Sequence, residues 1–390
     1  MPLSRLIPFD VGVVGGCSSR ELASRLIPWQ APSFAADLLL VLAGTRTAEH
    51  AGISAAGATA ESRRFTALAD AELLLAGPAV QRRWPLPPLP AGVSPALLSH
   101  VALEWLTLTP QIAAVGLEHQ PDQPHLRLEA SDLGPADCVS SGASMPLHRV
   151  QRLWRQGHRL GARLRRPLVL AECVPGGTTT ALGVLAGLGF EVSQWISGSG
   201  LHPPKVQKAE LVDAGLARAA LPPGASATAV LAAVGDPFQA MAAGLLRGVI
   251  HSGQPVLLGG GSQMLAVLAL ALDGMAPGER QALSQLVVLG TTSWLAAERV
   301  ADGASALCCL LDTVARRYQV PLLGLSSGLR FNTSRHQELR DFEDGYVKEG
   351  VGAGGLLVLA QLRGLSTPEL QRRCDQAMER LKAASVGSSE

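Results

Sequence analysis

AECVPGGTTTALGVLAGLG, residues 171–189, joins the signals of a strand, a tight turn and a helix start. The apolar run 168–171 leads into Glu172 and predicts a buried strand that ends at this carboxylate. A helix that begins directly after a strand presents its first amides at the sheet edge, where a phosphate can bind unpaired N–H groups. We therefore predict that the turn holds oxygen atoms of an anionic ligand through Gly176, Gly177, Thr178 and Thr179. The alternative is an ordinary strand–helix turn beside a solvated Glu172.

Strand-like and helix-like runs alternate along most of the chain. Strand-like runs occupy residues 37–43, 111–117, 167–171, 191–196, 254–258, 285–290 and 319–325. Helix-like runs occupy residues 146–165, 178–188, 205–220, 237–251, 263–272, 296–317 and 353–363, and segment 222–234 fits either type. This alternation predicts an α/β protein with a mainly parallel sheet covered by helices on both faces. Ligands of such sheets bind at the carboxyl ends of the strands, where the glycine turns fall here.

Composition narrows the class of protein. The 390 residues are 47% hydrophobic and 4% aromatic, and their formal net charge is +1. The apolar content excludes a disordered chain, and the charge balance gives no basic signature for nucleic-acid binding. The uncharged stretches fall short of the roughly 20 apolar residues of a membrane span. No N-terminal signal segment is visible, so we expect a soluble, cytoplasmic protein.

Cysteine and acid spacing argue against a metal centre. The six cysteines form no CxxC pair and no zinc spacing; they are Cys17, Cys138, Cys173, Cys308, Cys309 and Cys374. We expect them to be free, buried thiols, which suits a reducing cytoplasm. The HExxH and GxSxG motifs are absent, and the acidic residues lack the clustering of a dedicated Mg²⁺ site. The sequence therefore predicts no metal site and no cofactor.

A second glycine turn, SGSG at 197–200, follows a predicted strand. Its Gly198, Ser199 and Gly200 offer backbone contacts to a ligand. Lys205 and Lys208 follow three residues apart and share a face of the next predicted helix. We predict that one of these lysines pairs with a phosphate as a point charge. The alternative is that both form a solvated basic face.

A third turn, GGGSQ at 259–263, follows the predicted strand 254–258. Its consecutive glycines let backbone or a flat ligand approach closely, so Gly260 and Gly261 are candidate binding residues. Tight packing of the strand against a helix would explain the same glycines.

The C-terminal stretch FEDGYVKEGVGAGG, residues 342–355, sets Glu349 among glycines. Four glycines in six residues are unfavourable if they only begin a helix. We predict that Glu349 is a catalytic or binding carboxylate and that Gly350 and Gly352 contact the ligand. The alternative is an exposed acid on a loop.

These segments together resemble the nicotinate-nucleotide–dimethylbenzimidazole phosphoribosyltransferase family of cobalamin biosynthesis. The resemblance is strongest to the divergent branch in archaea and cyanobacteria, which is catalogued as an uncharacterised protein family. It rests on GISAAGA at 52–58, ECVPGGTTTALGVLAGLG at 172–189 and GSG at 198–200. It rests further on GDPFQAMAAGL at 235–245, LLGGGSQMLAV at 257–267 and VKEGVGAGG at 347–355.

The resemblance implies a reaction and roles for several residues. Phosphoribose would pass from nicotinate mononucleotide to a benzimidazole-like or purine base, and nicotinate would be released. The family's general base falls on Glu349, its strand-end glutamate on Glu172, and its phosphate lysine on Lys208, with Lys205 as competitor. The family's usual GGFE becomes Gly235-Asp236-Pro237-Phe238 here, which replaces a glutamate, and GGTTT replaces the usual GNTT.

The resemblance also implies a Rossmann-like, doubly wound large domain with a small domain built from both chain ends, in a homodimer. We expect residues 1–110 to contribute to the small domain, 111–340 to form the large nucleotide-binding domain, and 341–390 to carry the glycine-rich catalytic motif and the final helices. Two other functions stay open: a non-catalytic nucleotide-binding protein, and an N-glycosyl hydrolase acting on a nucleotide.

Overall fold

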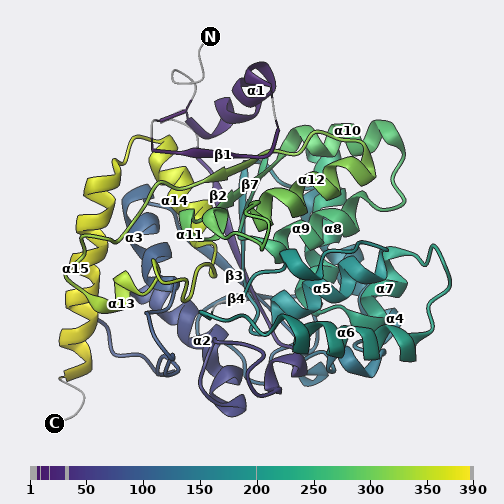
Figure 1. The fold of residues 1–390 in the computed structure, drawn as a ribbon, viewed down its shortest axis with the longest axis horizontal. Coiled ribbons are helices and arrows are strands. Elements are labelled where there is room, and N and C mark those ends of the chain that lie inside the picture. The colour runs from purple at the N-terminus through teal and green to yellow at the C-terminus, as the bar shows by residue number, and fades with distance from the viewer. Residues whose placement is uncertain (1–6, 9, 17, 31–34, 199, 387–390) are drawn as a thin grey trace.

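The computed structural model contains one eight-stranded sheet with helices on both faces (Figure 1). It describes residues 7–8, 10–16, 18–30, 35–198 and 200–386. The strand order is β1-β8-β7-β6-β5-β2-β3-β4, and β1 pairs antiparallel with β8 while the other pairs are parallel. The strands are β1 (Gly12–Val14), β2 (Asp37–Ala43), β3 (Pro110–Val115), β4 (His125–Arg127), β5 (Leu168–Cys173), β6 (Val256–Gly259), β7 (Val287–Thr291) and β8 (Gly324–Ser326). The predicted α/β class with a mainly parallel sheet is confirmed.

The helices connect these strands in the predicted alternation. They are α1 (Ser19–Gln30), α2 (Ala60–Ala76), α3 (Ala96–Leu106), α4 (Leu147–Gly161), α5 (Gly177–Gly187), α6 (Lys205–Ala219), α7 (Ala227–Val234), α8 (Pro237–Ser252), α9 (Ser262–Leu272), α10 (Pro277–Leu286), α11 (Ser293–Ala297), α12 (Ala306–Tyr318), α13 (Gln337–Arg340), α14 (Ala353–Leu362) and α15 (Thr367–Val386). Short 3₁₀ turns are η2 (Arg46–Glu49), η3 (Ser131–Leu133), η4 (Val139–Ser141) and η5 (Ser193–Trp195).

Each face of the sheet has its own hydrophobic core. One core joins α4, α5, α8, α9 and α12 to the sheet, and the other joins α1, α2, α3, α14 and α15 to it. Figure 1 shows these two groups on opposite sides of the strands. Helices from both chain ends meet in the second core, since α15 and α14 pack on α3. The boundaries at residues 110 and 340 stay a prediction, because one sheet includes strands from both sides of residue 110.

Several segments differ from the prediction: β8 begins only at Gly324 of the expected strand 319–325, and α2, α3, α10, α13 and α15 lie outside the predicted helix-like runs. Residues 191–196 form the short turn η5 instead of a strand, and β1 and β4 are short strands that the apolar pattern did not indicate. The expected helix 296–317 is two helices, α11 and α12, because residues 298–305 leave the helix. The ambiguous segment 222–234 contains helix α7, capped by the Ser226 hydroxyl.

Candidate functional site

Glu349 lies half-buried where α14 meets the carboxyl end of β7. Its carboxylate accepts hydrogen bonds from the backbone amides of Gly354 (3.0 Å), Thr292 (3.0 Å) and Gly350 (3.2 Å), and from the Thr291 hydroxyl (3.2 Å). Burial raises the pKa of Glu349 to about 7, although these four donors favour the ionised form. A carboxyl poised near neutral pH is suited to accept a proton during a reaction.

Unusual backbone conformations flank Glu349 on both sides. Val347 and Val351 have φ values of 48° and 54°, in the left-handed region that β-branched residues strongly disfavour. The Val351 amide donates to the carbonyl of Glu172 (3.0 Å), and the Ser99 hydroxyl donates to the Val351 carbonyl (2.9 Å). Strain maintained in this way is concentrated at functional sites, because the surrounding structure must over-determine it.

The glycines after Glu349 let α14 approach the strand ends directly. A Cβ on Gly354 would lie 2.2 Å from Thr291 backbone atoms, and one on Gly355 would lie 2.6 Å from the Cα of Gly259. A Cβ on Gly352 would meet the Ala171 side chain at 2.5 Å. The glycines at 352–355 therefore serve close helix–strand packing, and that packing brings Glu349 to the sheet edge.

Glu172 lies near the end of β5, as predicted, and lines the same cleft as Glu349. Burial is the main cause that raises its pKa to about 8, and the nearby charges of Asp236 and Glu349 raise it further. At neutral pH Glu172 therefore keeps its proton more readily than Glu349 does. Pairs of carboxyls whose pKa values are pushed apart in this way are typical of acid/base sites.

A large cavity opens beside these two carboxyls. It has about 1080 Å³ of empty space, including the part open to solvent, and we call it the main cavity. Glu172 and Glu349 line it together with the turn 174–178 and the loop residues 54–56. The proline-rich segment 84–95 has no regular secondary structure. Residues 86–87, 89 and 92–95 of that segment form one wall of the main cavity.

Lys208 lies at the neighbouring hollow, which Thr178, Gly198, Gly200 and loop 52–58 line with it. This Lys208 hollow adjoins the main cavity because Thr178 lines both. The Lys208 ammonium is buried and donates to the Thr178 hydroxyl (2.8 Å) and the Ser197 carbonyl (2.9 Å). Burial lowers its pKa to about 8.

Lys205 does not share this position. Its ammonium donates to the Gln194 carbonyl (2.7 Å) on the exposed side of α6. Of the two lysines between which the sequence left a choice, Lys208 faces the cleft and Lys205 does not.

The turn before α5 offers fewer free amides than predicted. The amide of Gly177 donates to the Val174 carbonyl (2.8 Å), and those of Thr179 and Thr180 donate to the Gly176 carbonyl (2.9 and 3.4 Å). These hydrogen bonds lie within the tight turn itself, in which Gly176 has a φ of 82°. The prediction that the whole first turn is unpaired is therefore wrong, and anion contacts here depend more on the Thr178 hydroxyl and Lys208.

The loop 50–58 at the cleft is fixed by a buried arginine. The Arg63 guanidinium donates to the carbonyls of Ala48 (2.6 Å), Gly57 (2.9 Å) and His50 (3.2 Å). Five donors in one planar group suit Arg63 to hold several turns of backbone at once. The loop that lines the cleft is thereby held in one shape.

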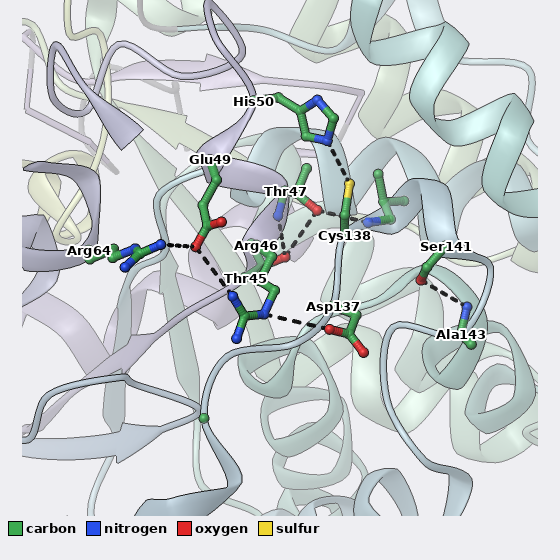
Figure 2. A network of polar contacts seen from close by, with 12 residues as sticks. Thr45, Arg46, Thr47, Glu49, His50, Arg64, Asp137, Cys138, Ser141 and Ala143 are labelled. Atoms are coloured by element: carbon green, nitrogen blue, oxygen red, sulfur yellow. Dashed lines mark hydrogen bonds and ion pairs between the residues drawn. The ribbon is translucent and has the colours of Figure 1, made fainter. Parts of the chain in front are cut away.

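A polar network anchors the start of this loop to the segment around η4 (Figure 2). The Thr47 hydroxyl accepts from the Val139 amide (2.9 Å), and the His50 ring contacts the Cys138 sulfur (3.2 Å). Arg46 lies between Asp137 (3.6 Å) and Glu49 (3.7 Å). These contacts hold η2 against the start of α5. The packing there is close, since a Cβ on Gly176 would touch Ala48.

Sequence reasoning missed a second buried lysine in the cleft. The Lys348 ammonium pairs with the Glu298 carboxylate (3.0 Å), which also accepts a hydrogen bond from the Ser197 hydroxyl. Lys348 and Glu349 line a further hollow with Glu172, Thr178 and Gly198. Glu298 follows α11 by one residue, so no motif in the sequence links it to residues 197 and 348.

Asp236 has a structural position beneath the cleft. It caps α8 by accepting from the Gln239 amide (2.9 Å), and its other oxygen accepts from Thr180 (2.5 Å) and Gln263 (2.8 Å). Burial raises its pKa. Asp70, on α2, was also missed and lines the main cavity.

The remaining predicted residues divide between the cleft and its supports. Gly176, Gly177 and Gly350 line the main cavity, and Gly261 lines the hollow beside Lys348. Gly260, Gly352 and Thr179 line none of the three spaces described above; the Thr179 side chain is fully buried. Ser199 lies outside the described residues.

The described part of the chain holds no cluster of three His, Cys, Asp or Glu side chains arranged to bind a metal ion. Within the same residues, no helix combines the length and apolarity needed to cross a bilayer. The five cysteines in the described ranges are free, but Cys138, Cys308 and Cys309 are only half-buried, contrary to the expected core position. Cys17 lies outside those ranges.

The sheet, with a cleft at the carboxyl ends of its strands, defines an α/β protein with a mainly parallel sheet. Two solved structures from Thermus thermophilus share this fold: CobT, with a TM-score of 0.58 and 20% identity, and nicotinate-nucleotide–dimethylbenzimidazole phosphoribosyltransferase, with 0.55 and 19%. The alignments cover 91% of this chain and 88% and 87% of those chains.

The chain belongs to the UPF0284 family. It is 59% identical to the UPF0284 protein of Parasynechococcus marenigrum (strain WH8102), over 98% of this chain and 97% of that protein. It is 42% identical to the one from Prochlorococcus marinus subsp. pastoris, over 88% of each. No family model matches the chain. The resemblance predicted from the motifs is confirmed in both respects, the cyanobacterial family and the fold.

Proposed function

We propose that the protein is a phosphoribosyltransferase that moves phosphoribose from nicotinate mononucleotide to a benzimidazole-like or purine base. One observation carries the proposal: two half-buried carboxyls, Glu349 and Glu172, share a cleft with the buried cation Lys208. A phosphate in the Lys208 hollow would set the ribose beside the carboxyls, and the main cavity would hold the acceptor base. The names of the structural neighbours supply the substrate class.

The transfer breaks one bond at the ribose C1′ and forms another. The pyridinium ring leaves with the electron pair of the C1′–N bond and becomes neutral at nitrogen, so it needs no acid. Positive charge grows at C1′ and is stabilised by a nearby carboxylate. The attacking azole nitrogen bonds to C1′, and the proton on its other ring nitrogen passes to the Glu349 carboxylate. Such proton transfer contributes on the order of 10²–10⁴ in rate.

The direct experiment replaces Glu349 by Gln. We expect Glu349→Gln to lose at least about 10²-fold in kcat with nicotinate mononucleotide and an azole, because an amide cannot accept the proton. Nucleotide affinity should stay within a few-fold, since Glu349 makes no contact with Lys208. Products are read by mass spectrometry, and Glu343→Gln, which changes a carboxylate bonded to Trp294 and Arg330, is the matched control.

Three other outcomes would replace the proposal. Wild-type turnover by Glu349→Gln would exclude Glu349 as the base. Release of nicotinate without any acceptor would indicate a nucleotide hydrolase. Binding of the nucleotide with no release of nicotinate, whatever base is offered, would indicate a non-catalytic binding protein.

A further inference from the structure

A third carboxyl faces the main cavity, away from the residues used above. Asp70 lies on α2, is 5% exposed, and lines this cavity with Ser94 and Cys173. One carboxylate oxygen accepts from the Ser94 hydroxyl (2.6 Å), and among the described residues the other accepts a hydrogen bond from the Cys173 thiol alone (3.4 Å). Burial raises the pKa of Asp70 to about 6, so the group is mostly ionised at neutral pH.

No basic side chain in the described ranges forms an ion pair with Asp70. A buried carboxylate without a counter-charge is costly unless donors satisfy it. A thiol is a weak donor, and a carboxylate has about four acceptor positions. Asp70 therefore keeps unused acceptor capacity at the wall of a cavity that the apolar side chains of Leu86, Leu89 and Val93 also line.

The chemistry of this wall discriminates between acceptor rings. A ring that presents methyl groups to Asp70 would strip water from the carboxylate and return no hydrogen bond. A ring that presents an amino or hydroxyl group would donate to the open oxygen while its flat faces contact the apolar side chains. Sites built to hydrogen-bond a polar group reject analogues that lack it far more strongly than apolar pockets reject extra methyl groups.

We propose that Asp70 determines acceptor specificity and that the acceptor base carries an amino or hydroxyl donor on the ring edge remote from the attacking nitrogen. This inference rests on the proposed function, because it takes the main cavity as the acceptor site. The Ser94 hydroxyl orients the Asp70 carboxylate through its hydrogen bond. Asp70, on α2, lines the same cavity as Glu349.

The test uses three isosteric bases: 5-aminobenzimidazole, 5-hydroxybenzimidazole and 5-methylbenzimidazole. Their affinities for the whole protein saturated with nicotinate mononucleotide are measured by calorimetry at pH 7.5, and product formation is measured separately. We expect the amino and hydroxyl bases to bind the wild type at least about 10-fold more tightly than the methyl base. Asp70→Leu should reverse this order, and Asp70→Asn, which keeps an acceptor oxygen, should only reduce the ratio.

The ratio of the affinities for two bases is measured within one variant, so partial loss of folded protein affects both affinities alike and leaves the ratio unchanged. The Ser94→Ala substitution tests the site without changing the Asp70 carboxylate. Ser94→Ala should keep the preference with a smaller ratio. Equal or tighter binding of the methyl base by the wild type, an unchanged ratio in Asp70→Leu, or no binding of any base would overturn the inference. If the ratio holds and no base is ever converted to product, the proposed function fails and the specificity of Asp70 stands.

Discussion

At the scale of single residues, the cleft gathers ionisable groups that the fold has removed from water. Asp70 is a buried carboxyl and Glu349 and Glu172 are half-buried ones, and the pKa values of all three are raised; Lys208 is a buried amine whose pKa is lowered. Each shift opposes the charged form that the group has on the surface. A fold keeps such groups when a ligand supplies the missing partners, so their concentration in one cleft supports a binding and acid/base role.

Glu172 gives a stability prediction with a defined sign. Its pKa is about 8 in the folded protein and close to 4.5 when unfolded, so folding binds its proton more tightly. This contribution to stability is full below about pH 4.5 and is lost as pH rises through about 8. The Glu172→Gln variant lacks this pH dependence of stability, because the glutamine amide does not titrate. We expect the variant to exceed the wild type in free energy of unfolding by at least ~1 kcal/mol at pH 8.5, with the difference vanishing towards pH 5.

Urea unfolding at pH 5, 7 and 8.5, monitored by circular dichroism, measures this difference. A difference that is the same at all three pH values would show that Glu172 is not held in its protonated form by the fold. Glu61→Gln, at the first turn of α2, provides a carboxylate outside the cleft for comparison.

Lys208 and Lys205 form a matched pair for nucleotide binding. Lys208→Met should weaken the affinity for nicotinate mononucleotide by about 10-fold or more, because a buried ammonium at the phosphate position is lost. Lys205→Met should change it less than about 2-fold, since the Lys205 ammonium bonds to the Gln194 carbonyl outside the cleft. Calorimetric titration compares the two. Equal effects of both substitutions would mean that the phosphate binds elsewhere.

At the scale of elements, α4 and α8 pack backbone to backbone. Gly157 and Gly161 of α4 face α8, and Gly244 and Gly248 of α8 face α4. A Cβ at any of these positions would lie 1.9–2.1 Å from a carbonyl oxygen of the other helix. The two pairs, each four residues apart, form one stripe per helix. This contact supports α8, which begins at Asp236 beneath the cleft.

We expect Gly244→Ala to destabilise the protein by about 1–3 kcal/mol, because the added methyl forces the helices apart. Helix propensity alone would predict a gain of nearly 1 kcal/mol for the same change. Gly278→Ala, in α10 with open space around it, is the control and should be neutral or slightly stabilising. Thermal and urea unfolding distinguish the two cases. A stable Gly244→Ala variant would show that the helices separate at little cost.

At the scale of the whole molecule, the cleft is a joint product of distant parts of the chain. Its walls come from residues 52–58 and 86–95, from the β5–α5 turn, and from the loop 347–351. The parallel sheet brings the ends of β5, β6 and β7 to one edge, and α14 closes on that edge through its glycines. The homodimer implied by the resemblance stays a prediction, which light scattering of the purified protein would test.

The sequence by itself determined the parts of this protein that depend on short-range pattern. It located β2, β3, β5, β6 and β7 and the helices α4, α5, α6, α8, α9, α12 and α14, because apolar periodicity and capping act over a few residues. It also singled out Glu349 and Glu172, since glycine turns beside charged residues mark strand ends, and the resemblance to the family favoured Lys208 over Lys205.

Only the tertiary structure decided how the remaining groups meet. The Glu298–Lys348 pair and the Ser94–Asp70 bond join residues 50 and 24 positions apart, and nothing local indicates them. The run 191–196 has strand-like composition but no place in the sheet, and the amides of the β5–α5 turn are consumed by the turn itself. Burial, counter-charge and contact are properties of three-dimensional neighbours, so they are set when the chain packs and not by residue order alone.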